Sequence, residues 1–423
     1  MTYVRRLVDT QLDELLPILP AIAVEGAKGV GKTATATARA ETVFSLDRDT
    51  TRTLVGDDPE LVTRGGSPTF IDEWQRVPST WDAVRRAVDD GAPAGRFLLA
   101  GSAYPDPKAR PHSGAGRIVR LLMRPMALPE RRVETPTVSL ASLVTGDDVP
   151  VEGATSFTTA DYAEEIVSSG FPGIRLADPA ARGHLLDSYV DRIVDHDIPE
   201  AGGVVRRPTS LLHWLTAYAA ATATTASYSS LLGAATPGQD QKPTKPTAIV
   251  YRDVLERIWV LDPLPAWIPG LGGLKHRGQA PKHHLVDPAL AARMVGATMD
   301  SLIRGEGPVA ARSGGTFLGA LFESLALQSV RVLARPLRAR ISHLRTQGGD
   351  HGVDIIVQRP DMRIVAIEVK LSTIVRPADV KHLNWLAGQL PDTVVNKVLI
   401  NTGPLAYRHK DGVAVVPLAL LGP

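Results

Sequence analysis

The sequence predicts a multidomain α/β protein, and three observations lead to this fold class. The chain has 423 residues, which indicates two to four domains at roughly 100–200 residues each. Short apolar runs alternate with helical patterns up to about residue 125, which is typical of a parallel sheet covered on both faces. Helical patterns fill the middle of the chain, and a helix followed by three strands begins after residue 315.

Composition excludes several classes of protein. Lys and Arg together number 47 against 45 Asp and Glu, so charge alone does not indicate a nucleic-acid-binding protein. Cysteine is absent, which excludes disulfides, thiol nucleophiles and cysteine-ligated zinc and fits a reducing cytosol. No apolar run reaches membrane-spanning length, and Met1–Leu19 lacks a signal-peptide pattern. We therefore expect a cytoplasmic protein without membrane contact.

A phosphate-binding motif lies near the N-terminus, where the chain fits G-x-x-x-x-G-K-[ST]. Ile22–Val24 predicts the strand before it and Ala34–Ala40 the helix after it, which is the context that this motif requires. Its glycines let backbone N–H groups turn toward phosphate oxygens, and the helix N-terminus adds partial positive charge. We expect Lys32 to reach the outer phosphates and Thr33 to ligate Mg²⁺; the alternative is a glycine turn that caps a helix. The predicted nucleotide-binding residues are Gly26, Ala27, Lys28, Gly29, Val30, Gly31, Lys32 and Thr33.

A second motif, which is acidic, follows some forty residues after the phosphate-binding motif. Pro68–Gln75 contains a short apolar strand that ends in Asp72 and Glu73, which is the pattern of the second ATPase signature. Asp72 would hold Mg²⁺, directly or through water, and Glu73 would orient and deprotonate the attacking water. The alternative is an exposed acidic strand end. Between the two motifs we expect a strand over Thr42–Leu46 and a polar loop over Asp47–Gly66 with one short helix.

The next strands carry further candidates. Ser79–Asp90 predicts an amphipathic helix, and Arg96–Ser102 predicts a strand whose terminal Ser102 would sense the γ-phosphate or simply end the strand. Gly116–Pro125 mixes basic and apolar residues like a fifth strand. From it Arg117, as first choice, or Arg124 would reach a nucleotide in cis or in a neighbouring subunit; an exposed strand face is the alternative.

The middle of the chain predicts a linker and a helical lid. Glu134–Thr159 is rich in Pro, Thr and Ser and predicts a surface excursion. Tyr162–Ser169 predicts the start of a lid, and Gly170–Pro172 would either lie near the nucleotide base or stop a helix. His184–Pro199 predicts a helix whose acidic residues form a solvated face.

Three short helices are predicted over 209–260, followed by Leu261–Leu264. This order suggests a winged-helix module, whose third helix would enter a major groove or whose surface would serve as a lid or protein contact. Few basic residues favour the second use. Lys282, His283 and His284 follow, and adjacent strand histidines point to opposite faces, so they do not suit one metal ion. The basic residues on the third helix and its leading loop are Lys242, Lys245, Arg252 and Arg257.

The C-terminal strands predict a second site. Glu323 lies in the helix Gly315–Ala334, Asp354 begins one strand, and Glu368 and Lys370 share one face of the next. This set fits a restriction-endonuclease constellation, in which the carboxylates bind one or two Mg²⁺ ions and Lys370 orients or activates water. The alternative is a Glu368–Lys370 salt bridge in a partner-docking domain.

These motifs together resemble a family. Ile71–Gln75, Ala100–Ser102 and the basic segment ending at Glu130 resemble AAA+ ATPases, specifically bacterial and archaeal ones with a middle winged-helix region and a C-terminal restriction-endonuclease-like domain of unknown function. The resemblance implies a P-loop parallel-sheet ATPase core over 1–133, a linker and helical lid over 134–200, a winged-helix-like region over 201–300 and a restriction-endonuclease-like α/β domain over 301–423.

Two functions follow from the two constellations. The first is an ATP- and Mg²⁺-dependent ATPase, active as a homo-oligomer, that controls a nuclease-like domain acting on DNA or RNA. The alternative is a signalling or scaffold ATPase whose C-terminal domain binds a protein partner and cuts nothing. A chaperone-like remodeller would need an aromatic pore loop, which the sequence lacks.

Overall fold

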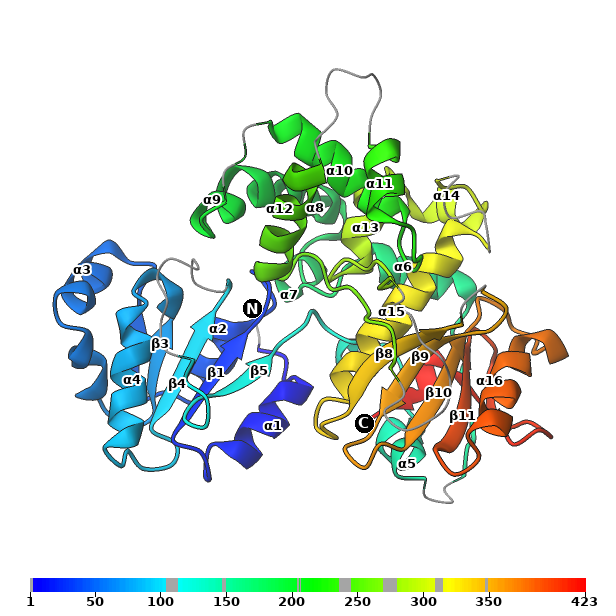
Figure 1. The fold of residues 1–423 in the computed structure, drawn as a ribbon, viewed down its shortest axis with the longest axis horizontal. Helices are drawn as coiled ribbons and strands as arrows, with labels where there is room; N and C mark the ends of the chain where they lie inside the picture. Colours follow the sequence, from blue (N-terminus) through cyan, green and yellow to red (C-terminus); the bar gives the residue numbers. More distant parts are fainter. Residues whose placement is uncertain are drawn as a thin grey trace.

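The computed structural model describes residues 3–103, 113–146, 150–203, 205, 207–235, 245–268, 280–308, 315–346 and 349–423. Figure 1 shows the N-terminal sheet on the left, the C-terminal sheet on the right, and helices from the middle of the chain above both. Among the described residues, no helix is long and apolar enough to cross a membrane.

The N-terminal sheet is parallel throughout, as the alternation of strands and helices predicts. Its order is β2-β3-β4-β1-β5, and every residue of β1, β3 and β4 is buried. Because all strands run the same way, their carboxyl ends meet at one edge, where functional loops gather. The strands are β1 (Ala21–Glu25), β2 (Thr42–Ser45), β3 (Thr69–Asp72), β4 (Phe97–Gly101) and β5 (Val119–Leu122).

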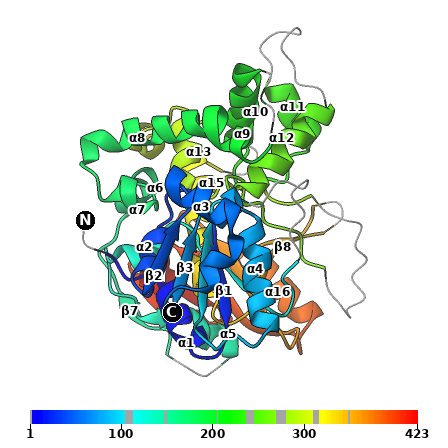
Figure 2. The same ribbon diagram turned by 90° about the vertical axis from the view of Figure 1, so that its left-hand side faces the viewer.

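Helices cover both faces of this sheet (Figure 2). The loop predicted over Asp47–Gly66 is wrong in part, because most of it is helical. Val55 and Val62 are fully buried in the cluster beneath the sheet, so packing of these two side chains orders a stretch whose polar composition indicates a loop. The helical elements are α1 (Leu7–Leu15), α2 (Lys32–Thr37), α3 (Asp49–Asp57), η1 (Pro59–Thr63), η2 (Trp74–Arg76), α4 (Ser79–Asp89) and η3 (Leu128–Arg131).

The linker predicted over Glu134–Thr159 is instead built into the C-terminal part of the molecule. Here β7 (Gly153–Ala154) pairs with β12 (Leu405–Arg408), and β6 (Val138–Ser139) pairs with β14 (Leu421–Gly422). The helix α5 (Leu140–Thr145) buries its leucines and Val144. These pairings join positions more than 240 residues apart, so no local pattern indicates them.

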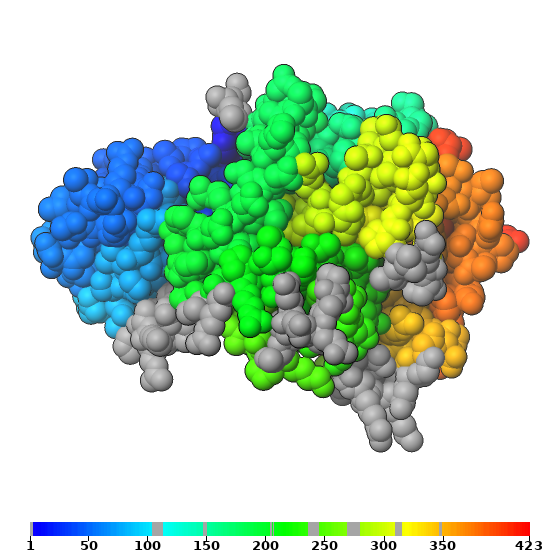
Figure 3. Space-filling view, turned by 90° about the horizontal axis from the view of Figure 1, so that it is seen from above, coloured from blue at the N-terminus to red at the C-terminus, as the bar shows by residue number. Residues whose placement is uncertain are grey.

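The middle of the chain is helical. Three of its helices, α10 to α12, precede antiparallel bridges between Leu261 and Leu285 and between Leu264 and Lys282; the winged-helix assignment stays a prediction, and Lys242 lies outside the described residues. Figure 3 shows this helical part between the two sheet domains. Its elements are α6 (Thr159–Val167), α7 (Pro172–Arg175), α8 (Pro179–Arg192), the π-helix η4 (Ile193–Asp197), α9 (Ile198–Glu200), α10 (Pro208–Ala220), α11 (Tyr228–Ala234), α12 (Lys245–Arg257), α13 (Pro288–Met294) and α14 (Met299–Ile303).

The C-terminal domain is an α/β domain built on a mixed sheet, whose strand order is β7-β12-β13-β11-β10-β9-β8. β8, β9 and β10 are antiparallel neighbours, whereas β10, β11 and β13 are parallel. Its remaining elements are α15 (Phe317–Leu333), β8 (Arg340–Arg345), β9 (Gly352–Gln358), β10 (Ile364–Val369), α16 (Pro377–Gln389), β11 (Val394–Asn401), β13 (Ala414–Pro417) and η7 (Leu418–Leu420).

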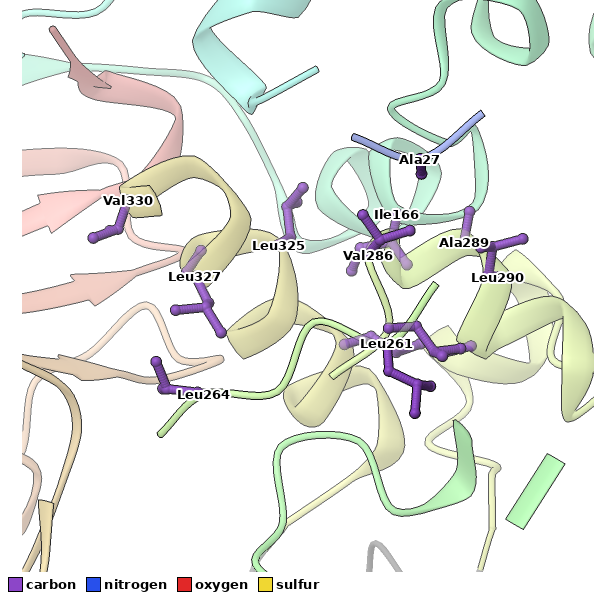
Figure 4. Close-up of a cluster of buried hydrophobic side chains, with 14 of the residues drawn as sticks. Ala27, Ile166, Leu261, Leu264, Val286, Ala289, Leu290, Leu325, Leu327 and Val330 are labelled. Carbon is purple, nitrogen blue, oxygen red and sulfur yellow. The ribbon is translucent and has the colours of Figure 1, made fainter. Parts of the chain in front are cut away.

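One apolar cluster links all three parts of the molecule. It contains Ala27 of the phosphate loop, Leu290 of α13 and Leu325 of α15 (Figure 4). Because protein interiors are close-packed, a shift at one end of such a cluster is felt by its neighbours. The phosphate loop therefore belongs to the same apolar cluster as residues of the middle helices and of α15.

Candidate functional site

The phosphate loop turns between β1 and α2 in a conformation that needs glycine. Gly26, Gly29 and Gly31 have φ values of +149°, +80° and +106°, which side chains with a Cβ rarely adopt. A Cβ on Gly26 would also lie 2.1 Å from the carbonyl oxygen of Met123. The loop therefore has the tight, backbone-lined shape expected of a phosphate cradle.

Lys32 lies inside this loop. Its Nζ donates to the carbonyl oxygens of Gly26 at 2.8 Å and Ala27 at 2.9 Å. Burial lowers the pKa of Lys32 to about 8, because desolvation disfavours the ammonium. Its hydrogen-bond partners are neutral, so an incoming phosphate would supply the missing counter-charge.

Thr33 and Asp72 meet below the loop, at the carboxyl end of β3. The Thr33 hydroxyl donates to the two carboxylate oxygens of Asp72 at 3.0 and 3.2 Å. Burial raises the pKa of Asp72 to about 6. A hydroxyl and a carboxylate side by side fit the oxygen ligands that Mg²⁺ prefers, with its other positions left to phosphate and water.

Glu73 and Ser102 also come together, from β3 and β4. Ser102 Oγ donates to Glu73 Oε2 at 2.7 Å, and Gln75 Nε2 donates to both Ser102 Oγ, at 3.2 Å, and Glu73 Oε2. Glu73 has a φ of +53°, a strained backbone that is often found at functional positions. Sequence reasoning missed Gln75, whose only signal is a polar side chain two residues beyond Glu73.

The two candidate arginines lie away from this cluster. Arg117 donates to Asp89 of α4 at 2.8 Å. Arg124 forms a two-pronged pair with Asp262, at 2.7 and 3.1 Å, and Arg331 reaches the same carboxylate at 2.8 Å. Arg124 is therefore engaged in a contact between domains.

The start of the lid lies directly on the phosphate loop. A Cβ on Gly29 would lie 3.7 Å from the ring of Phe171 and 3.9 Å from that of Tyr189, and these two rings are 4.7 Å apart. The Tyr189 hydroxyl donates to the carbonyl of Lys28 at 3.1 Å. The segment Gly170–Pro172 is thus next to the predicted nucleotide site, and a contact with the base stays a prediction.

The solvated acidic face predicted over His184–Pro199 is present at Asp191 and Asp195, which are exposed, but not at Asp197. Asp197 is 7% exposed, and its carboxylate lies 2.6 Å from Lys28 Nζ. Glu200 pairs with Lys28 at 2.6 Å and with Arg76 at 2.8 Å. The distance from Lys28 to these partners, about 170 positions along the chain, explains why periodicity did not reveal them. A cavity of 330 Å³ adjoins these groups and is lined by Lys28, Arg52, Gln75, Arg76, Ser102, Ala103, Asp197, Glu200 and Ile258.

The C-terminal carboxylates also come together, and they form ion pairs with two lysines. Lys282 Nζ lies 2.7 Å from Glu323 and 2.9 Å from Asp354. Lys370 Nζ lies 2.8 Å from Glu368 and 3.7 Å from Asp354. Sequence reasoning placed Lys282 beside the two histidines without a role, because its contact with α15 and β9 is purely tertiary.

Two ammonium groups compensate the charge of this carboxylate cluster. The neighbouring carboxylates raise the pKa of Lys282 despite its burial, and burial raises the pKa of Glu323 to about 7 and that of Glu368 well above its usual range. Among the described residues, one group of His, Cys, Asp or Glu side chains has ligand atoms close enough to share a metal ion: His196, Asp197 and Glu200. The two carboxylates of this group already pair with Lys28 and Arg76. The Mg²⁺ site at Asp354, Glu368 and Glu323 stays a prediction, and in this structure the three carboxylates pair with Lys282 and Lys370.

Comparison with known proteins places the parts of the chain in families. The AAA domain matches residues 19–131, and domains of unknown function named DUF8612 and DUF4143 match residues 159–301 and 318–421. The N-terminal part is therefore an AAA-type P-loop ATPase domain, followed by DUF8612 in the middle and DUF4143 at the C-terminal end.

Individual relatives are distant. The uncharacterized protein Rv2008c of Mycobacterium tuberculosis and the uncharacterized protein Mb2031c of Mycobacterium bovis are each 26% identical over 339 residues, which cover 78% of this chain and 67% of theirs. Among solved structures, the Walker-type ATPase PABY2304 of Pyrococcus abyssi is 14% identical with a TM-score of 0.40 and covers 69% of this chain and 96% of its own.

Proposed function

We propose that this protein binds ATP with Mg²⁺ at the carboxyl edge of the N-terminal sheet and hydrolyses it. The observation that carries the proposal is that side chains following the carboxyl ends of β1, β3 and β4 come together: Thr33 contacts Asp72, and Ser102 contacts Glu73, beside Lys32 of the phosphate loop. An AAA domain match over residues 19–131 supports the same conclusion.

The residues divide the work of hydrolysis. Lys32 would exchange its two backbone carbonyls for phosphate oxygens, which provide the negative charge that it lacks. Thr33 and Asp72 would hold Mg²⁺, which neutralises charge on the outer phosphates when bound. Glu73 would accept a proton from the attacking water. Ser102 and Gln75 would orient the Glu73 carboxylate, since both donate to it.

Two substitutions test this assignment. Lys32→Ala should abolish ATP binding, and Glu73→Gln should retain binding but lower turnover by about 10²–10⁴-fold, the scale of a lost general base. Binding is measured with a fluorescent ATP analogue and turnover by phosphate release. Glu14→Gln, an exposed change on α1, is the control and should match the wild type. Normal turnover in Glu73→Gln would contradict the assignment.

We further propose that turnover is faster in a homo-oligomer, where an arginine of a neighbouring copy stabilises the transition state, an effect of up to about 10³–10⁵. Arg117 suits this role better than Arg124, because its side chain is 47% exposed against 14%. Specific activity should rise with protein concentration and Arg117→Ala should remove that rise. A flat activity across dilution, from a protein that sediments as a monomer, would refute the idea.

For the C-terminal domain we propose a docking role in place of DNA or RNA cleavage. The observation that favours this second function is Lys282, which bridges Glu323 and Asp354 where a nuclease would place its metal ion. The purified protein is incubated with Mg²⁺ or Mn²⁺ and single-stranded DNA, double-stranded DNA or RNA, with and without ATP. We expect no cleavage. Cleavage that Asp354→Ala and Glu368→Ala both remove, with ATP hydrolysis intact, would restore the nuclease.

A further inference from the structure

A carboxylate pair from the lid lies on the phosphate loop. Asp197 Oδ1 and Glu200 Oε2 each lie 2.6 Å from Lys28 Nζ. The second oxygen of Glu200 accepts from Arg76 at 2.8 Å. Glu200 thus joins a cation of the phosphate loop to a cation of η2, the turn that follows the catalytic acid pair.

The local fold explains how these acids reach the loop. The helix α8 ends in the π-helix η4 (Ile193–Asp197), and α9 follows at once with Pro199. π-Turns widen a helix and are frequent at functional sites. Asp197 and Glu200 are three positions apart, so they lie on the same face of the helix. The Tyr189 hydroxyl, bound to the carbonyl of Lys28, fixes the same face against the loop.

The contact is partly shielded from water and therefore stronger than an exposed ion pair. The side chains of Lys28 and Asp197 are 26% and 8% exposed, and the pair is screened less by salt than a surface pair would be. The cavity beside this contact is also lined by Arg52 and by Ser102, whose hydroxyl donates to Glu73.

A nucleoside triphosphate would compete directly with these carboxylates. Its terminal phosphate brings negative charge to the loop that holds Lys28, and like charges a few ångströms apart repel strongly where water is partly excluded. Lys28 and Arg76 already pair with the lid acids. Phosphate oxygens that approach these two cations, beyond the charge that Lys32 and Mg²⁺ neutralise, would therefore compete with the two carboxylates.

We propose that Asp197 and Glu200 form an acidic latch that holds the lid on the phosphate loop, and that the outer phosphates of a nucleoside triphosphate displace these carboxylates from Lys28 and Arg76. The proposal rests on the nucleotide-binding function above and adds Arg76 as a residue that contacts phosphate in cis. The latch makes triphosphate binding open the α8–α9 end of the lid, whereas a diphosphate leaves the latch closed.

The test compares affinities for fluorescent ATP and ADP analogues in the full chain. Glu200→Gln and Asp197→Asn should each tighten ATP binding by about tenfold, within the usual range of coupling between two binding events, and should change ADP binding little. Asp195→Asn removes the same charge from an exposed position of the same π-helix and should leave both affinities unchanged. Adding Arg76→Ala to Glu200→Gln should weaken ATP binding more than ADP binding.

A second measurement follows the lid itself. In the wild type, a non-hydrolysable ATP analogue should speed amide exchange over residues 193–201, and ADP should not. The latch would be overturned, and the proposed function left standing, if the wild type binds nucleotide but one of two results is found. The first is an ATP affinity that is unchanged or weaker in both latch variants, and the second is an amide exchange rate that ATP does not change. Absence of nucleotide binding in the wild type and in both variants would overturn both.

Discussion

Replacement of Asp262 by Asn should destabilise the protein strongly. The Asp262 carboxylate takes two contacts from Arg124 of the N-terminal domain, at 2.7 and 3.1 Å, and one from Arg331 of α15, at 2.8 Å. Asn keeps the shape of the side chain but removes its charge. Arg124 and Arg331, only 14% and 7% exposed, would then face each other without a counter-charge.

The expected loss is large on the scale of protein stability. Removing one partner of a buried ion pair costs about 3–5 kcal/mol. Unfolding entropy of about 2.1 cal/mol/K per residue gives roughly 0.9 kcal/mol/K if all 423 residues unfold together. The melting temperature should therefore fall by about 3–6 °C, and by more if only part of the chain unfolds with this contact.

The assay is calorimetry at pH 7.5 beside a matched control. Asp253→Asn breaks an ion pair of similar length, in which the Asp253 carboxylate lies 2.8 Å from Arg252. The side chain of Asp253 is 55% exposed. Such surface pairs contribute about 0–1 kcal/mol, so this variant should melt within about 1 °C of the wild type. Equal melting temperatures for Asp262→Asn and Asp253→Asn would refute the reasoning.

The same contact predicts a dependence on pH. The two arginines hold the pKa of Asp262 well below its usual range despite burial. A group whose folded-state pKa is depressed contributes stability that is present above its unfolded pKa, about 3.9, and is lost as pH falls through the folded value. The difference between wild type and Asp262→Asn should therefore shrink below about pH 4.

The remaining predictions concern the nucleotide site and the C-terminal cluster. ATP affinity should be flat below pH 8 and fall by up to about tenfold per pH unit above it, because Lys32 with a pKa of about 8 must then take up a proton on binding; a flat titration to pH 9.5 would contradict this. Phe171→Leu should weaken ATP and ADP by the same factor in equilibrium titrations, since its ring contacts the loop at Gly29; a loss confined to ATP would contradict it. Asp354→Ala should lower the melting temperature, because it removes one of the two carboxylates that pair with buried Lys282. If Mn²⁺ without nucleotide raised the melting temperature of the wild type by binding at this cluster, the proposal that lysines fill the cluster would be contradicted.

Local sequence patterns predicted several side chains that the fold brings together, and the reason is physical. A phosphate loop needs glycines and a lysine at fixed spacing, and Asp72, Glu73 and Ser102 each end an apolar strand. Because parallel strands place their carboxyl ends at one edge of a sheet, the fold class alone brings these residues together. The register of β1, β3 and β4 agrees with this expectation.

Tertiary structure alone decided which charges compensate each other. Lys28 with Glu200, Arg124 with Asp262, and Lys282 with Asp354 are 172, 138 and 72 positions apart. Hydrophobic periodicity determines which face of an element is buried but contains no information about which distant ion meets which. A buried charge needs a partner, and the tertiary arrangement of the three parts of the chain determines which partner it meets. The ion pairs of Asp197 and Glu200 with the phosphate loop, and of Lys282 with Glu323 and Asp354, are for this reason properties of the folded chain that the sequence by itself did not reveal.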